Sequence, residues 1–286
     1  MTKQGSSKGK RGPLSWLLFI LVIGAALITF SILLFLILYI LWNGIPNLTP
    51  SLFAWEYNSE NVSLMPALLN TLILTAVSLL IAVPLGIGSA IYMIEYAKRG
   101  NKIVGIVRIT AETLSGIPSI VYGLFGMLFF VTSMGFGYSI LAGALTLAIM
   151  ILPLIMRTTE EALKSVPDSF REGSFGLGAG RVRTIFKIVL PAAIPGILSG
   201  IILSIGRIVG ETAALMYTAG TVTDVVSGEG LSFLMDSGRT LAYHMYALSC
   251  EGFHTNEAYA TAVVLLAIVM IINWISGAIA KKLSKI

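Results

Sequence analysis

The chain has 286 residues, of which 56% are hydrophobic and only 12% are charged. Its uncharged stretches are too long for soluble helices, so the composition predicts an integral membrane protein. A net charge of +5 would suit a nucleic-acid partner, but the Lys and Arg residues lie in clusters beside apolar stretches, which is the pattern that encodes membrane topology. One cysteine, Cys250, and two histidines, His244 and His254, exclude an intrachain disulfide and offer no metal-ligand spacing.

The first predicted element is an uncharged run over residues 14–42, which follows a basic tail over residues 1–13. The run is too long for a signal peptide and lacks a cleavage site of small residues, so we expect a retained membrane helix. The next loop, up to Ser63, holds two acidic residues but no Lys or Arg, as expected of an outer loop.

Five further spans are predicted from the apolar stretches that follow. The second span of the chain is interrupted by Pro84 and Gly86. The uncharged run from Thr113 to Met156 suffices for two crossings, with a glycine-rich turn at Ser133–Ser139 between them. The five spans cover residues 64–94, 116–132, 140–156, 191–219 and 258–280, within one membrane domain over residues 64–282.

Six spans with both ends inside place every Lys and Arg except Arg207 and Arg239 on the cytoplasmic side. The predicted fold class is therefore an all-α integral membrane protein with its N- and C-termini in the cytoplasm. Near the inner surface we expect two ordinary ion pairs, and in the outer loop we expect two neutral, solvated histidines. The expected pairs are Glu95 with Lys98 or Arg99, and Arg108 with Glu112.

The longest cytoplasmic loop, residues 157–190, is predicted to hold two short amphipathic helices hinged at Gly178. Pro167 and Asp168 suit the first turn of the first helix. Because the flanking charges keep this loop at or beyond the lipid headgroups, its apolar residues need a protein groove, although an amphipathic helix on the membrane surface is the alternative. The apolar residues at helical spacing are Leu163, Val166, Phe170 and Leu177 before the hinge, and Val182, Ile185, Phe186 and Val189 after it.

The same loop carries the most specific motif of the chain. Glu172, Gly173 and Ser174 are followed by three residues and then by Gly178. Nine residues separate Gly178 from Ile188, and one residue separates Ile188 from Leu190 and Pro191. This spacing resembles the EAA---G---------I-LP signature in the membrane subunits of ATP-binding-cassette (ABC) importers, with Gly-Ser in place of Ala-Ala. The resemblance implies a type I importer core whose coupling loop seats in a cleft of an ATPase. It also implies that Glu172 contacts the ATPase, that Gly178 makes the turn and that Leu190-Pro191 joins the fifth span.

Two charged residues, Arg207 and Glu211, lie within the predicted fifth span at i, i+4 spacing. An unpaired arginine near mid-membrane costs at least about 2.5 kcal/mol, so both side chains should face the protein interior or an aqueous path. One interpretation is a structural ion pair. The preferred one is a substrate pathway in which Arg207 meets an anion, because the planar guanidinium donates two parallel hydrogen bonds to a tetrahedral oxyanion.

Three further stretches, residues 116–126, 206–220 and 244–266, resemble the permeases of phosphate (Pst) importers in the CysTW group. The last two are more similar to the PstA-type than to the PstC-type subunit. The resemblance implies a homologous PstC-like permease, a PstB-like ATPase dimer and an external PstS-like phosphate-binding protein as partners, in a bacterial or archaeal plasma membrane. The chain lacks a GxxxxGK[ST] loop, so ATP hydrolysis is expected of the partner.

Two alternatives remain open at this stage. The first is a permease for another oxyanion, such as sulfate or molybdate, or the PstC-type partner. The second belongs to a different class, an ATP-independent channel or secondary carrier. A protein of that class would have no use for the hinged cytoplasmic loop.

Overall fold

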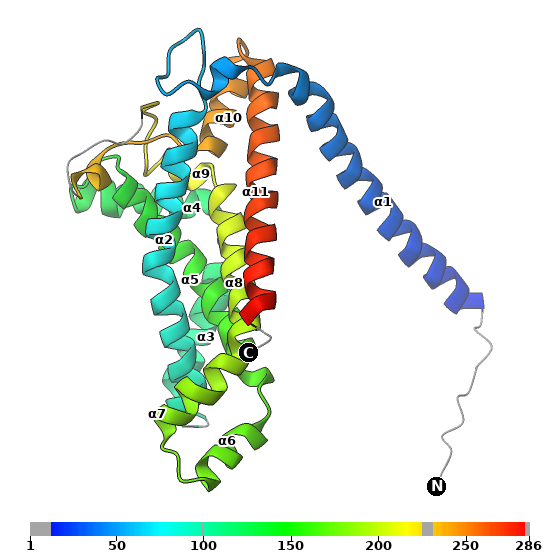
Figure 1. Ribbon diagram of the computed structural model, residues 1–286, viewed down its shortest axis with the longest axis vertical. Helices are drawn as coiled ribbons and strands as arrows, with labels where there is room; N and C mark the ends of the chain where they lie inside the picture. The colour runs from blue at the N-terminus through cyan, green and yellow to red at the C-terminus, as the bar shows by residue number, and fades with distance from the viewer. Residues whose placement is uncertain (1–12, 99, 225–230, 284–286) are drawn as a thin grey trace.

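The structure, a computed structural model, describes residues 13–98, 100–224 and 231–283. Throughout these residues the regular structure is helical, without a strand, which confirms the all-α prediction. Figure 1 shows the long helices α2, α5, α8 and α11 side by side, with α1 leaning away from them. The predicted basic tail lies outside the described residues except for Pro13.

Five of the described helices are long and apolar enough to cross a membrane. The helix α1 has no buried residue in its apolar window, whereas two thirds of the corresponding window of α5 are buried inside the protein. The five helices are α1 (Pro13–Gly44), α2 (Met65–Ile91, continued by a π-helical turn over Tyr92–Tyr96), α5 (Ile140–Ser165), α8 (Leu190–Val209) and α11 (Thr255–Leu283).

In place of the straight span predicted over residues 116–132, the structure has a bent pair of helices, which makes a sixth candidate crossing if the two count as one span. Helix α3 (Lys102–Ser115) meets α4 (Ser119–Gly126, extended by a π-helical segment to Ser133) at an angle of 104°. The break has a local cause, because Gly116 caps α3 and Pro118, with extended backbone, cannot continue it.

The fifth span also ends earlier than predicted. Helix α8 stops at Val209 and Gly210 caps it, so residues 211–219 do not continue the helix. They form instead a turn and the short helix α9 (Ala213–Met216). The prediction of one helix over residues 191–219 is therefore wrong, because α8 ends before Glu211 and a separate short helix follows.

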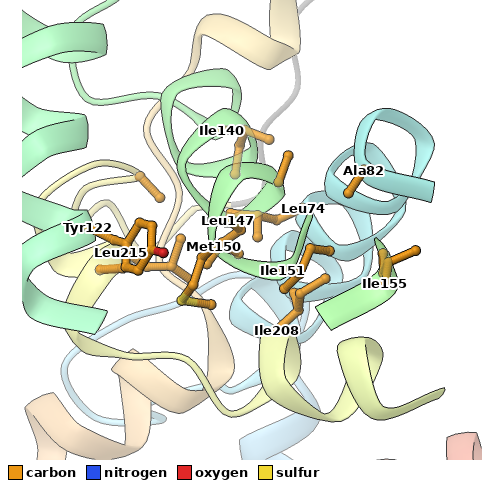
Figure 2. Packing of buried hydrophobic residues seen from close by; sticks show 13 residues of the cluster. Leu74, Ala82, Tyr122, Ile140, Leu147, Met150, Ile151, Ile155, Ile208 and Leu215 are labelled. Carbon is orange, nitrogen blue, oxygen red and sulfur yellow. The ribbon is translucent and has the colours of Figure 1, made fainter. Parts of the chain in front are cut away.

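The main hydrophobic core is organised around α5. Leu147, Met150 and Ile151 of α5 lie at its centre, and Figure 2 shows side chains from α2, α4, α8 and α9 packed around them. A second hydrophobic core joins the cytoplasmic ends of α2, α3, α5 and α8. Its members include Ala90, Met93, Val104, Leu163, Val166, Val189 and Ala193.

The outer end of the bundle is closed by α10 (Leu241–Glu251) and the loops that precede α2. His244 of α10 is only 1% exposed, which makes the prediction of a solvated histidine wrong. Its ring lies edge-on to Tyr57, with ring centroids 6.0 Å apart. Burial, with the charge of Arg239 as the next cause, lowers the pKa of His244 to about 4, so that it remains neutral and packs as an aromatic side chain.

Glycines determine how closely the helices approach. A Cβ atom at Gly86 would lie 2.7 Å from the Ile155 side chain, whereas a Cβ atom at Gly88, two residues along the same helix, would meet nothing within 4 Å. We therefore expect Gly86→Val to push α2 away from α5 and to destabilise the protein by about 1–3 kcal/mol. Thermal unfolding of the detergent-solubilised protein measures this difference.

Gly88→Val is the matched control, because it adds the same β-branched side chain to the same helix where there is space. Equal melting temperatures for the two variants would contradict the close α2–α5 contact.

Candidate functional site

A charged cavity of about 510 Å³ opens between α3, α5 and α8. Its wall carries four basic and three acidic residues, so one positive charge is in excess. The basic residues are Arg108, Arg157, Lys164 and Arg207, and the acidic ones are Glu112, Glu160 and Glu161.

The packing of α5 against α8 determines how deep each residue of the cavity lies. Cβ atoms at Gly196 and Gly200 of α8 would meet Ala162 and Thr158 of α5, so the two helices run antiparallel. Arg207 lies seven residues beyond Gly200, or about 10 Å further from the cytoplasmic end. Lys164, near the end of α5, lies at the cytoplasmic mouth of the cavity, and Arg207 lies at the end of the same cavity that is furthest from the cytoplasm.

At the mouth, a buried carboxylate holds two basic residues. Oε1 of Glu160 lies 2.6 Å from Nη2 of Arg108 and 2.6 Å from Nζ of Lys164, and its side chain is 9% exposed. The predicted partner of Arg108, Glu112, is therefore replaced by Glu160 of another helix. Arg157 and Glu161, 3.1 Å apart, are both about two-thirds exposed and so contribute little to stability.

Arg207 and Glu211 do not form the predicted pair on one helix face, because α8 ends between them. Glu211 is 8% exposed, and its Oε1 accepts a hydrogen bond of 3.0 Å from the backbone N–H of Ala214. It thus caps the start of α9, while Arg207 lines the cavity. The sequence does contain the signal for this break, since Gly210 is a typical helix C-cap and an acidic residue suits the following helix start.

The second candidate region is the coupling segment, defined here as residues 167–189. It contains α6 (Asp168–Gly176), a turn at Gly178 and α7 (Arg181–Thr184), which a π-helical turn joins directly to α8. Gly178 has a φ angle of +81°, which confirms the predicted left-handed turn. At the cytoplasmic end of the bundle, Figure 1 shows α6 and α7 projecting beyond the long helices.

The two motif positions that depart from Ala-Ala differ in their surroundings. Ser174 is 4% exposed, and its hydroxyl lies 2.8 Å from that of Thr184, so it links α6 to α7. A Cβ atom at Gly173 would meet nothing within 4 Å. The serine therefore has a structural role within the segment, and the glycine leaves space on its surface.

The apolar residues of the cytoplasmic loop divide into two sets, rather than forming one exposed stripe before and after the hinge. Leu163, Val166, Ile185 and Val189 are buried in the protein. The remainder form an exposed apolar surface beside Glu172, which is also exposed. This surface consists of Phe170, Phe175, Leu177, Val182 and Phe186.

Glu95, which was predicted to pair with Lys98 or Arg99, instead binds Arg171 of α6 at 2.7 Å. Arg99 lies outside the described residues. The sequence offers no signal for this pair, because its members are far apart in the chain and meet only when the helices pack.

Residues 82–285 match the family of binding-protein-dependent transport system inner membrane components. The chain is 36% identical over 276 residues to the probable ABC transporter permease protein YqgI of Bacillus subtilis, covering 91% of this chain and 94% of the relative. It is 43% identical to the phosphate transport system permease protein PstA 1 of Mycobacterium tuberculosis over 154 residues, which are 54% of this chain and half of the relative.

The fold also resembles a solved bacterial alginate ABC transporter in complex with a pentasaccharide-bound periplasmic protein. The TM-score is 0.61 at 15% identity, and the alignment covers 93% of this chain and 98% of the other. At that identity the similarity concerns the fold. Together with the match over residues 82–285, it identifies the chain as a multi-pass membrane protein of the family of binding-protein-dependent transport system inner membrane components.

Proposed function

We propose that the chain is the permease subunit of an ATP-driven phosphate importer and that it forms, with a homologous permease, the path for phosphate into the cytoplasm. The observation that carries this function is Arg207 at the inner end of a cavity whose mouth lies beside the coupling segment. Several relatives named as phosphate transport permeases support phosphate as the substrate.

The path needs a second wall. The cavity is lined by residues of α3, α5 and α8 and is partly open, which suits a homologous PstC-like permease as the facing half. Arg207 presents a planar guanidinium to this space, and Glu211, held by the backbone of Ala214, lies just beyond it. A phosphate oxyanion can accept two parallel hydrogen bonds from such a guanidinium.

ATP hydrolysis is assigned to a partner, because the chain is a transport subunit. The exposed apolar surface of the coupling segment, with Glu172 beside it, suits a groove on a PstB-like ATPase dimer. The opposite end of the bundle, closed by α10, would receive phosphate from an external PstS-like binding protein. The assembly would lie in the plasma membrane of a bacterium or archaeon, which is the inner membrane in a Gram-negative cell.

Uptake of radiolabelled phosphate into proteoliposomes that hold the full assembly tests this function. We expect uptake to require hydrolysable ATP on the side of the coupling segment and to be competed by unlabelled phosphate more strongly than by sulfate. Uptake that persists without ATP would indicate a channel or carrier, and stronger competition by sulfate or molybdate would indicate another oxyanion.

The role of Arg207 leads to the first functional prediction. We expect Arg207→Gln to lower phosphate uptake by about tenfold or more, since a hydrogen bond to a charged group contributes about 1.5–3 kcal/mol. Arg207→Lys keeps the charge but loses the fork, so it should retain an intermediate rate. The initial rate of uptake measures both.

Lys102→Gln is the control for the loss of one positive charge, because Lys102 is exposed on the cytoplasmic side and does not line the cavity. If Arg207→Gln transports as fast as this control, Arg207 does not contact the anion.

The turn at Gly178 leads to the second functional prediction. Gly178→Val places a β-branched residue at a φ angle of +81°, which disfavours the turn and should misalign α6 with α7. We expect the variant to insert in the membrane normally but to lose ATP-driven uptake. Membrane content and uptake are measured on the same vesicles.

Gly173→Ala tests the same segment without strain, because the added methyl group has space and alanine favours the helix. It should transport as the unmodified protein does. Normal uptake by Gly178→Val would count against the coupling role of this turn.

A further inference from the structure

Helix α6 is poorly anchored by apolar packing. Ser174 is its only buried residue, and its large apolar side chains Phe170 and Phe175 are about half exposed. The position of α6 must therefore depend on polar contacts. Ser174 provides one, to Thr184 of α7, and Arg171 provides the others.

Arg171 uses all five of its N–H donors. Nε and Nη2 donate to Oε1 of Glu95 at 3.1 and 2.7 Å, and Nη1 donates to Oδ1 of Asp168 at 3.2 Å. The remaining N–H groups donate to the backbone carbonyls of Leu163 and Val166, at the end of α5. One guanidinium thus joins α6 to both α2 and α5.

The contact with Glu95 is shielded from water. The Arg171 side chain is 15% exposed and that of Glu95 is 9% exposed, whereas the side chain of Asp168 is 79% exposed. Removing one member of a buried pair leaves the other charge uncompensated, whereas an exposed pair contributes little. The pair with Glu95 therefore holds α6 much more firmly than the pair with Asp168.

Tyr96, which follows Glu95 in the chain, contacts α7, the second helix of the coupling segment. The guanidinium carbon of Arg181, in α7, lies 5.7 Å from the centre of the Tyr96 ring. Glu95 and Tyr96 are the last two residues of the π-helical turn that ends α2. Met93 of the same turn is 6% exposed in the cytoplasmic core that also contains residues of α5 and α8.

We propose that Glu95 and Tyr96 are positioning residues that carry the movement of the coupling segment to α2 and α5. This proposal rests on the proposed ATP-driven function. The segment is covalently continuous with α8 through α7, but its contacts through Arg171 and Arg181 make it move with α2 and α5 as well. Without the contacts of Arg171 and Arg181, α6 would turn about Pro167 while α5, which forms part of the cavity wall, stayed where it is.

The test compares ATP hydrolysis with phosphate uptake in proteoliposomes of the full assembly. Glu95→Gln keeps the size of the side chain and removes its charge. We expect the assembly to form and hydrolyse ATP, while phosphate transported per ATP falls clearly below that of the unmodified assembly, because α5 no longer moves with the coupling segment. Asp168→Asn is the matched control, because it removes the exposed acid from the same guanidinium and should keep the ratio unchanged.

If the Glu95→Gln assembly does not form, a second pair of variants tests the same proposal at Tyr96. Tyr96→Leu removes the aromatic face below Arg181, and Tyr96→Phe keeps it. We expect the leucine variant to lower phosphate transported per ATP and the phenylalanine variant to restore it.

Two results would overturn the proposal: an unchanged ratio in Glu95→Gln, whether or not hydrolysis and uptake fall together, or equal ratios in the two Tyr96 variants. Failure of the proposed function itself is distinguishable, since the unmodified assembly would then show no ATP-dependent uptake.

Discussion

Close packing of α5 against α8 is the contact on which both candidate regions, the cavity and the coupling segment, depend. Gly196 and Gly200 let the two helices approach closely enough for Ala162 and Thr158 to lie against the α8 backbone. Because the helices are antiparallel and connected through the coupling segment, one hairpin carries the exposed apolar surface at its closed end and Arg207 near its open end. A change in the separation of the two arms would alter the cavity between them directly.

The charges of this chain are stabilised in different ways according to their depth. Glu160 and Glu95 are both about nine-tenths buried, and each binds a cation that comes from another helix. Such pairs are costly to break and specify a particular arrangement, although their net contribution to stability can be small. The exposed pair of Arg157 and Glu161 lacks this role. At the cytoplasmic end an apolar core joins α2, α3, α5 and α8, whereas polar contacts determine the position of α6, which has little apolar packing of its own.

Much of the fold could be predicted because it depends on local sequence. The absence of charges over 14–42 and 258–280 corresponds to α1 and α11, and Gly178 adopts the left-handed turn that its place between two amphipathic stretches predicted. The spacing of the motif from Glu172 to Pro191 predicted the family. These features need no knowledge of how distant segments pack.

The errors concern helix ends and distant partners. The apolar stretch up to Ala219 predicted a helix that continues past Gly210, and the i, i+4 spacing then placed Arg207 and Glu211 on one helix face, whereas α8 ends at Val209. A helix break at Pro118 is predictable from the sequence, but the pairing of α3 with α4 at 104° is not, because it depends on how two separate helices pack. Arg108–Glu160 and Arg171–Glu95 join separate helices, and nearby opposite charges in the sequence offered simpler but incorrect partners.

If the proposed function is correct, the cavity of α3, α5 and α8 opens to the cytoplasm and closes when the partner ATPase closes. Ser115 lies on its wall and is exposed, and Cys250 is the only native cysteine, so Ser115→Cys in a Cys250→Ser background provides a single reporter. Its rate of alkylation by a membrane-impermeant maleimide should be measured in inverted vesicles, with and without nucleotide trapped on the ATPase. We expect rapid labelling without nucleotide and protection in the trapped state; equal labelling rates in the two states would show that the cavity does not close with the ATPase.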